Sequence, residues 1–174
     1  TRLPNIMEWI TEQKPDVLLL QEIKCETDAF PAMEFQSAGY HAAVLGQKSY
    51  NGVAILSRHA MTDVRERLPH DTIMNTPADT PIDMQARYIE ATVQGVRVAS
   101  IYLPNGNPIS TESEKYPYKL AWMERLQKHA ATLLQNETPV VLGGDYNVIP
   151  DPIDVHDPKA WVDDALFHPR TRTP

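Results

Sequence analysis

The sequence predicts an α/β fold, a layered sandwich in which two sheets pack face to face with helices outside. Two short apolar runs, at residues 17–21 and 139–142, have the length and composition of buried strands. Residues 87–102 form two alternating segments around a Gln-Gly turn, which is typical of a β-hairpin. Expected helices lie before, between and after these strands, so we place them on the outer faces.

Short helices and strands are expected to alternate in the first half of the chain. Asn5 favours the start of a helix, which must end before Pro15 because the residue before a proline avoids the helical region. Gly39 ends a second helical segment. The expected elements are a helix at 5–13, a strand at 17–21, a helical turn or two within 25–38, and strands at 40–45 and 52–57.

One long helix dominates the second half. Its apolar residues at 120, 123, 126, 130, 133 and 134 follow the helical period. No internal repeat or low-complexity linker interrupts the chain, so residues 1–174 are predicted to form a single domain. The remaining expected elements are loops at 68–84, 105–117 and 150–158, the hairpin at 87–102, the helix at 118–134, a strand at 139–142 and a short helix at 160–167.

Three expected strands end in side chains suited to metal or phosphate chemistry. Glu22 follows the first apolar run, Tyr102 ends the hairpin, and Asp145 and Asn147 follow two glycines after the last run. Positions i and i+2 of an extended chain face the same side, so Asp145 and Asn147 are expected to face one site. Mg²⁺ accepts one or two carboxylates, and a carboxamide or phenol can donate to a phosphate. A plain alternative stays open, because Gly-Gly-Asp is also common in turns.

Four segments resemble, in order and spacing, the exodeoxyribonuclease III family of abasic-site endonucleases in the endonuclease/exonuclease/phosphatase superfamily. They are Leu20–Lys24, Asn51–Ser57, Tyr102–Gly106 and Gly144–Asn147. The resemblance covers nearly the whole chain. It implies a divalent-metal-dependent DNA phosphodiesterase of base-excision repair, with 3′–5′ exonuclease activity on duplex DNA and abasic-site (AP) endonuclease activity.

The resemblance also implies roles for single residues. Glu22 corresponds to a ligand of Mg²⁺ or Mn²⁺, and Asp145 to a catalytic carboxylate that also contacts the metal. Asn147 corresponds to a phosphate-binding amide at the metal, Tyr102 to a catalytic phenol, and Asn105 to a substrate contact.

Three further residues have expected roles near these motifs. Lys115 lies in the expected loop after the Asn-Gly segment, where its ammonium can approach a phosphate of the substrate. Arg87 and Asp154 match family positions with expected structural roles, a buried ion pair for Arg87 and a loop cap for Asp154.

Two family features are missing from the sequence. A first strand that carries a site Asn is absent, and so is a C-terminal half-domain with a Ser-Asp-His segment. The sandwich is therefore expected to be incomplete, with unpaired sheet edges and exposed apolar surface, and the 174-residue chain alone is expected to be inactive on abasic-site DNA. The alternatives are a superfamily phosphatase or phospholipase acting on a small phosphoester, or a non-catalytic remnant.

Composition limits the class of protein. The net charge of −7 argues against a large non-specific DNA-binding module, although double-stranded DNA with abasic sites or 3′ ends is the partner that the resemblance implies. One cysteine and no apolar run of membrane length lead us to expect a cytoplasmic protein without membrane contact, monomeric when full length.

Overall fold

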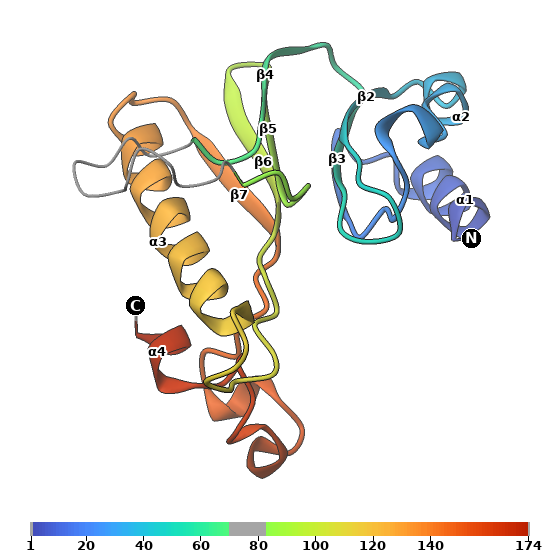
Figure 1. Cartoon of the computed structure of the whole chain (residues 1–174). Coiled ribbons are helices and arrows are strands. Elements are labelled where there is room, and N and C mark those ends of the chain that lie inside the picture. The colour runs from blue at the N-terminus through green and yellow to red at the C-terminus, as the bar shows by residue number, and fades with distance from the viewer. Residues whose placement is uncertain (1, 70–82, 174) are drawn as a thin grey trace.

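Four layers make up the molecule, with helices on the outside and two sheets between them (Figure 1). The structure is a computed structural model, and it describes residues 2–69 and 83–173. The predicted α/β sandwich is confirmed. Most of the expected loop at 68–84 lies outside the described residues.

The first sheet has three antiparallel strands in the order β1-β3-β2. These strands are β1 (Val17–Gln21), β2 (His41–Leu45) and β3 (Val53–Ser57). Helices α1 (Leu3–Gln13) and α2 (Ala32–Ser37) cover its outer face, with a short 3₁₀ helix at Thr27–Ala29 between β1 and α2. The central strand β3 is buried along its whole length, as expected of a strand covered on both faces.

The second sheet has four strands in the order β4-β5-β6-β7. They are β4 (Met61–Glu66), β5 (Tyr88–Val93), β6 (Val96–Tyr102) and β7 (Val140–Asp145). The β4-β5 and β5-β6 pairs are antiparallel, whereas β6 and β7 run parallel. The long helix α3 (Lys115–Leu134) joins β6 to β7 and packs on the outer face. A parallel pair needs such a crossover connection.

Side chains alternate between the layers along each strand. Ile55 of β3 and Ile89 of β5 meet in the core between the sheets, whereas their neighbours turn outward. Tyr88 and Ile101 contact Trp122 of α3 in a second core. A third core lies between the first sheet and helices α1 and α2.

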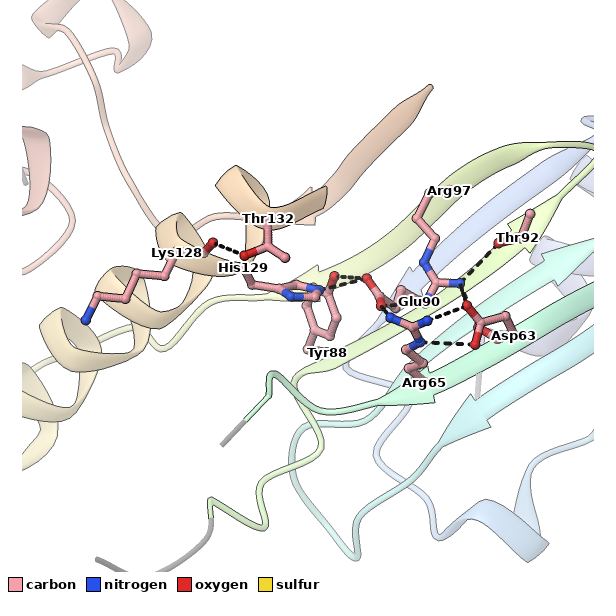
Figure 2. Close-up of polar contacts among 9 residues, drawn as sticks. All are labelled: Asp63, Arg65, Tyr88, Glu90, Thr92, Arg97, Lys128, His129 and Thr132. Carbon is pink, nitrogen blue, oxygen red and sulfur yellow. Dashed lines mark hydrogen bonds and ion pairs between the residues drawn. The ribbon is translucent and has the colours of Figure 1, made fainter. Parts of the chain in front are cut away.

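A buried charged network fastens α3 to the second sheet, as Figure 2 shows. The carboxylate of Glu90, only 1% exposed, accepts hydrogen bonds from Arg97 of β6, Tyr88 of β5 and His129 of α3, with 2.9 Å between His129 Nε2 and Glu90 Oε2. Burial alone raises the pKa of Glu90, but the hydrogen bonds from His129, Arg97 and Tyr88 outweigh it and lower the pKa to about 2. The carboxylate therefore stays ionised in the core.

Several element boundaries differ from the sequence prediction. Helix α1 begins at Leu3, with Pro4 in its first turn, so Asn5 is not its cap. Helix α3 begins at Lys115 rather than at residue 118, because Pro117 also fits a first helical turn. Strand β4 was not predicted, since most of its residues are exposed and its pairing contains a bulge.

The C-terminal region consists mainly of short turns. Its elements are 3₁₀ helices at Pro152–Asp154 and Pro158–Trp161 and helix α4 (Pro169–Arg172). The helix predicted at 160–167 is wrong, because only its first residues are helical, in a 3₁₀ turn. No helix in residues 2–69 or 83–173 is long and apolar enough to cross a membrane.

Strands β1 and β7 lie at sheet edges, each with one paired neighbour among the described strands. The prediction that the strand at 17–21 is fully buried is therefore wrong, since all of its residues are only half-buried. Between these edges the two sheets leave an open groove of about 370 Å³ that includes Leu19 and Val141, the latter 50% exposed. Unpaired edges and exposed apolar surface were both expected.

We predict that Glu90→Gln lowers the free energy of unfolding by about 3 kcal/mol at neutral pH, because removing one charge of a buried network leaves its partners uncompensated. The folded-state pKa of Glu90, about 2, lies below the ordinary 4.5. Its contribution is therefore fully present above pH 4.5 and is lost as the pH falls toward 2. Urea unfolding at several pH values measures both effects.

The matched control is Glu124→Gln on the exposed face of α3, where the carboxylate pairs with Lys128 one turn away. Exposed pairs of this kind contribute about 0.3–0.5 kcal/mol. Equal losses for the two variants, or a Glu90→Gln loss that does not shrink as the pH falls below 4.5, would contradict the assignment.

Candidate active site

The parallel pairing of β6 and β7 brings two of the predicted site residues together. In this register Tyr102 is paired with Asp145, so both side chains stand at the same end of the sheet. The next residue, Leu103, continues the pairing, with 2.9 Å between its amide nitrogen and the carbonyl oxygen of Asp145. Tyr102 and Asp145 are thus fixed by backbone hydrogen bonds of adjacent strands.

The two glycines before Asp145 are strand residues rather than a turn. Strand β7 continues through Gly143 and Gly144 to Asp145, so the turn alternative is wrong. A Cβ atom at Gly144 would overlap the backbone of Ile101 on β6, and one at Gly143 would lie 2.7 Å from Leu19 Cδ1 of the first sheet. Glycine allows this close approach of backbones, which is a common reason for glycine inside a strand.

Ser100 connects the end of β1 to β6. Its buried hydroxyl donates to the carbonyl oxygen of Leu20 (3.0 Å) and accepts from Gln21 Nε2 (3.0 Å). Ser100 lies two residues before Tyr102, and Gln21 directly precedes Glu22. This contact between the sheets therefore brings Glu22 beside Tyr102. No sequence motif singled out Ser100.

Glu22 and Tyr102 influence each other directly. A hydrogen bond from Lys24, whose Nζ lies 2.8 Å from Glu22 Oε2, lowers the pKa of Glu22 against the opposing effect of burial, and the nearby Tyr102 hydroxyl lowers it further. Burial raises the pKa of Tyr102, and the negative charges of Glu22 and Asp145 raise it further. At neutral pH the site therefore combines an ionised Glu22 with a neutral phenol that can donate.

Asn147 reaches the site through a turn. It lies outside β7 with a φ of 47°, and its amide nitrogen donates to Asp145 Oδ1 (2.9 Å). The prediction that extended geometry aligns these two residues is wrong, although they do lie together. The side-chain amide of Asn147 donates to the carbonyl oxygen of Leu103 (2.8 Å), and its Oδ1 lies 3.4 Å from Asn105 Nδ2. One N–H of the Asn147 amide is left for a substrate oxygen.

A buried lysine beneath this pair was not predicted as a site residue. Lys119 of α3 is fully buried, and its Nζ donates to the backbone carbonyls of Asn147 and Asn105, the latter at 3.1 Å. Burial lowers the pKa of Lys119 to about 8, and the charges of Asp164 and Asp145 oppose that shift. In the sequence Lys119 is one lysine among several in an amphipathic helix, so no pattern separated it from the others.

The three remaining predicted residues have different outcomes. Lys115 is exposed and begins α3, so it is not in a loop, and its approach to a phosphate stays a prediction. Asp154 is a loop cap as expected, with Asp151 N donating to its Oδ2 at 2.9 Å.

Arg87 is not in a buried ion pair. In the part of the chain that the structure describes, Arg87 forms no salt bridge. Its Nε instead donates to Gln85 Oε1 at 2.7 Å, and its guanidinium lies over the Tyr102 ring, 5.0 Å from the centroid. The residue supports Tyr102 rather than neutralising a carboxylate.

Left-handed backbone conformations gather at this end of the molecule. Glu22, Lys24, Asn51 and Asn147 all have positive φ angles, between 47° and 54°. Backbone hydrogen bonds join the turn after β1 to the loop before β3, with 3.1 Å between Lys24 N and Asn51 O and 3.3 Å between Ile23 N and Gly52 O. Non-glycine residues adopt this region at a cost, and such strain often marks functional sites.

The oxygen atoms of the site suit a hard divalent cation. Glu22 and Asp145 are two carboxylates near the same phenol, and one or two carboxylates with several waters satisfy Mg²⁺. Asp145 uses only Oδ1 to accept from Asn147. Residues 2–69 and 83–173 contain no group of three or more His, Cys, Asp or Glu side chains placed to hold a metal.

A sequence model described as the endonuclease/exonuclease/phosphatase family matches residues 2–174. The chain belongs to the endonuclease/exonuclease/phosphatase family. Nucleases of this family in general depend on a divalent metal ion, in agreement with the oxygen-rich site.

Relatives in sequence and structure confirm the resemblance. Exodeoxyribonuclease III of Haemophilus influenzae is 31% identical over 157 residues, which are 87% of this chain and 55% of that protein. An AP endonuclease from Archaeoglobus fulgidus has a TM-score of 0.86 at 38% identity, and the 3′ phosphatase NExo from Neisseria bound to product DNA hairpin has 0.85 at 36%. These two matches cover 98% of this chain and 62% of each structure, so the chain spans little more than half of its relatives' length.

We predict that Gly144→Ala destabilises the protein by about 2–3 kcal/mol, because the added methyl group forces β7 away from β6. The matched control is Gly95→Ala in the hairpin turn. Gly95 also has a positive φ, 82°, but nothing lies within 4 Å of the position of its Cβ. The control should therefore lose only about 1 kcal/mol of backbone conformational energy.

Urea unfolding measures both changes in stability. Similar losses for the two glycine variants would show that close packing of β7 on β6 is unimportant at Gly144.

Proposed function

We propose that the protein containing this chain is a divalent-metal-dependent DNA phosphodiesterase of base-excision repair. It cleaves the DNA backbone at abasic sites and removes nucleotides from 3′ ends of duplex DNA. The proposal rests on the proximity of Glu22, Tyr102 and Asp145 at one end of the sandwich. Each of the three lies at or just after the end of a strand. The names of the relatives, which include an exodeoxyribonuclease III and an AP endonuclease, support DNA as the substrate.

Each site residue has its own proposed role in the reaction. Mg²⁺ or Mn²⁺ held by Glu22 and Asp145 would supply positive charge that polarises the scissile phosphate and stabilises the leaving oxygen. The neutral phenol of Tyr102 and the free N–H of Asn147 donate to phosphate oxygens, where negative charge grows in the transition state. The free oxygen of Asp145 takes part in proton transfer, either at the attacking water or at the leaving group.

Contacts to the rest of the substrate are assigned to residues on the loop after β6 and at the start of α3. Asn105 lies next to Asn147 and is placed to contact the DNA backbone, and the exposed ammonium of Lys115 is assigned to a more distant phosphate. A monomeric state, a cytoplasmic location and inactivity of the 174-residue chain alone are part of the same proposal.

A second candidate reaction is removal of a 3′ phosphate from DNA. The relative named 3′ phosphatase NExo, bound to product DNA hairpin, favours it. The same donors can stabilise a phosphate monoester. In both reactions water attacks the phosphorus and the 3′ oxygen of the DNA leaves, and they differ in whether the phosphorus also carries a second nucleoside, as in a diester, or only free oxygens, as in a monoester. Duplexes that end in a 3′ phosphate and duplexes with an internal abasic site distinguish them.

We predict that Glu22→Gln lowers the cleavage rate of abasic-site duplex about 10²-fold or more and weakens the dependence on Mg²⁺, because a carboxylate ligand becomes an amide. Loss of one electrostatic contact in the transition state commonly costs about 10²–10³-fold. Asp145→Asn should remove turnover and leave DNA binding largely intact, since it removes proton transfer without adding bulk.

The assay follows single-turnover cleavage with and without chelator, in the longest form of the protein that the gene encodes. Glu26→Gln is the matched control, because Glu26 is an exposed carboxylate four residues from Glu22. Native rates for both site variants, or cleavage that survives complete chelation, would remove these residues and the metal from the mechanism.

A further inference from the structure

Lys119 is a buried cation to which the proposed chemistry assigns no role. It is the only lysine with no exposed surface among those that the structure describes. Its ammonium donates to two backbone carbonyls, those of Asn105 after β6 and Asn147 after β7. These two asparagines belong to different loops, and their side chains meet at 3.4 Å. One side chain of α3 thus joins both loops directly below their functional groups.

The Pro-Asn-Gly segment after β6 is shaped around this lysine. Gly106 has a φ of 89°, and a Cβ atom there would lie 2.7 Å from Lys119 Cδ. The same position is 3.2 Å from Tyr116 Cδ2 and from Ala165 Cβ, so the space is closed on several sides. The glycine that the family resemblance includes as part of a motif therefore makes room for the stem of Lys119.

The buried charge of Lys119 has no direct acidic partner. Within residues 2–69 and 83–173, no carboxylate lies within ion-pair distance of its Nζ, and Asp164, in the nearby 164–166 turn, binds Asn107 instead (3.0 Å). Buried charges are normally paired, because removing an ion from water is costly. Two carbonyl oxygens satisfy two of the three ammonium donors and leave a net positive charge beneath the asparagine pair.

We propose that Lys119 is a positioning residue, which holds Asn105 and Asn147 side by side and provides a fixed positive charge beneath the phosphate that they bind. The proposal rests on the proposed function for the identity of that phosphate. An anion seated on the asparagines would gain from a cation below it in a poorly solvated environment, where charges interact more strongly than in water. The role of Lys119 is indirect, since its backbone contacts lie between it and the substrate.

If Lys119 has this role, its loss should affect the binding of DNA and the rate of turnover differently. A duplex is held by many phosphates, so the loss of Lys119 should change KM little. The asparagine donors must be in place as charge develops on the scissile phosphate, so kcat should fall. A purely structural lysine would change stability and leave the kinetic constants of the folded fraction unchanged.

The test compares Lys119→Met, which keeps the stem and removes the charge, with Lys119→Gln, which keeps a donor without charge. Lys128→Met is the control, because Lys128 lies on the exposed side of the same helix and pairs with Glu124. Two measurements are made at neutral pH in the longest form of the protein that the gene encodes. One is the NMR spectrum of the side-chain amides of Asn105 and Asn147 without DNA, and the other is kcat and KM on abasic-site duplex.

For Lys119→Met we expect shifted or broadened amide signals for both asparagines and a kcat about 10–100-fold lower, with KM changed less than about 3-fold. Lys119→Gln should lie between Lys119→Met and the native protein, and Lys128→Met should match the native protein. If Lys119→Met fails to fold, the amide spectrum and the kinetic constants of Lys119→Gln test the proposal instead. Native amide signals, or a native kcat in a folded Lys119 variant, would overturn the proposal. If the unsubstituted protein cleaves no DNA, the proposed function fails, and the amide spectra still decide whether Lys119 positions the two asparagines.

Discussion

The parallel pairing of β6 and β7 is the constraint on which the site depends. Parallel neighbours end at the same edge of a sheet, so Tyr102 and Asp145 are paired at one end of the molecule. An antiparallel arrangement of the same two strands would put them at opposite ends. The pairing needs backbones close enough that only glycine fits at Gly144. A backbone requirement thus decides where the chemistry of the site can occur.

The crossover between these strands also supports both the site and the core of the second sheet from the outer face. Helix α3 must return the chain from the end of β6 to the start of β7, so it passes along the whole outer face. Near its start it carries Lys119 below the loops of the site, and near its end it carries His129 into the buried network around Glu90. Displacement of α3 would therefore disturb both the core and the site.

The first sheet supplies Glu22 to the site. Ser100 bonds to Leu20 and Gln21, and this holds Glu22 against Tyr102 across the interface between the sheets. The turn that follows is strained, with left-handed residues at Glu22 and Lys24 locked by the loop that contains Asn51. Carboxylate, phenol and amide groups are thus positioned before substrate arrives, which favours stabilisation of a transition state.

Much of this arrangement was predictable from local sequence. Local sequence identified β1, β2, β3 and the first half of β7, and the period of α3 was clear from residue 118 onward, because buried faces leave a regular pattern. The rule that functional side chains follow strands also selected Glu22, Tyr102 and Asp145, which the structure brings together.

The residues that were missed act through long-range packing. Lys119 and Ser100 have no local signal, since a lysine in an amphipathic helix or a serine in a strand is usually unremarkable in sequence. The two glycines at 143 and 144 allowed either a turn or a strand, and only their neighbours in space, Leu19 at Gly143 and Ile101 at Gly144, show why glycine is needed there. The exposed edge strand β4 lacks the apolar pattern by which strands are recognised.

We assign Glu22, Tyr102 and Asp145 to one site for a divalent cation and a phosphate. Titration of the isotope-labelled protein with Mn²⁺, followed by paramagnetic broadening of its NMR signals, tests this most directly, because broadening falls steeply with distance from the ion. We expect the signals of Glu22, Tyr102 and Asp145 to broaden together at the lowest Mn²⁺ concentrations and to recover when excess Mg²⁺ is added. Broadening that begins at another acidic surface, such as the one around Asp63 and Glu66, while these three signals stay sharp would contradict it.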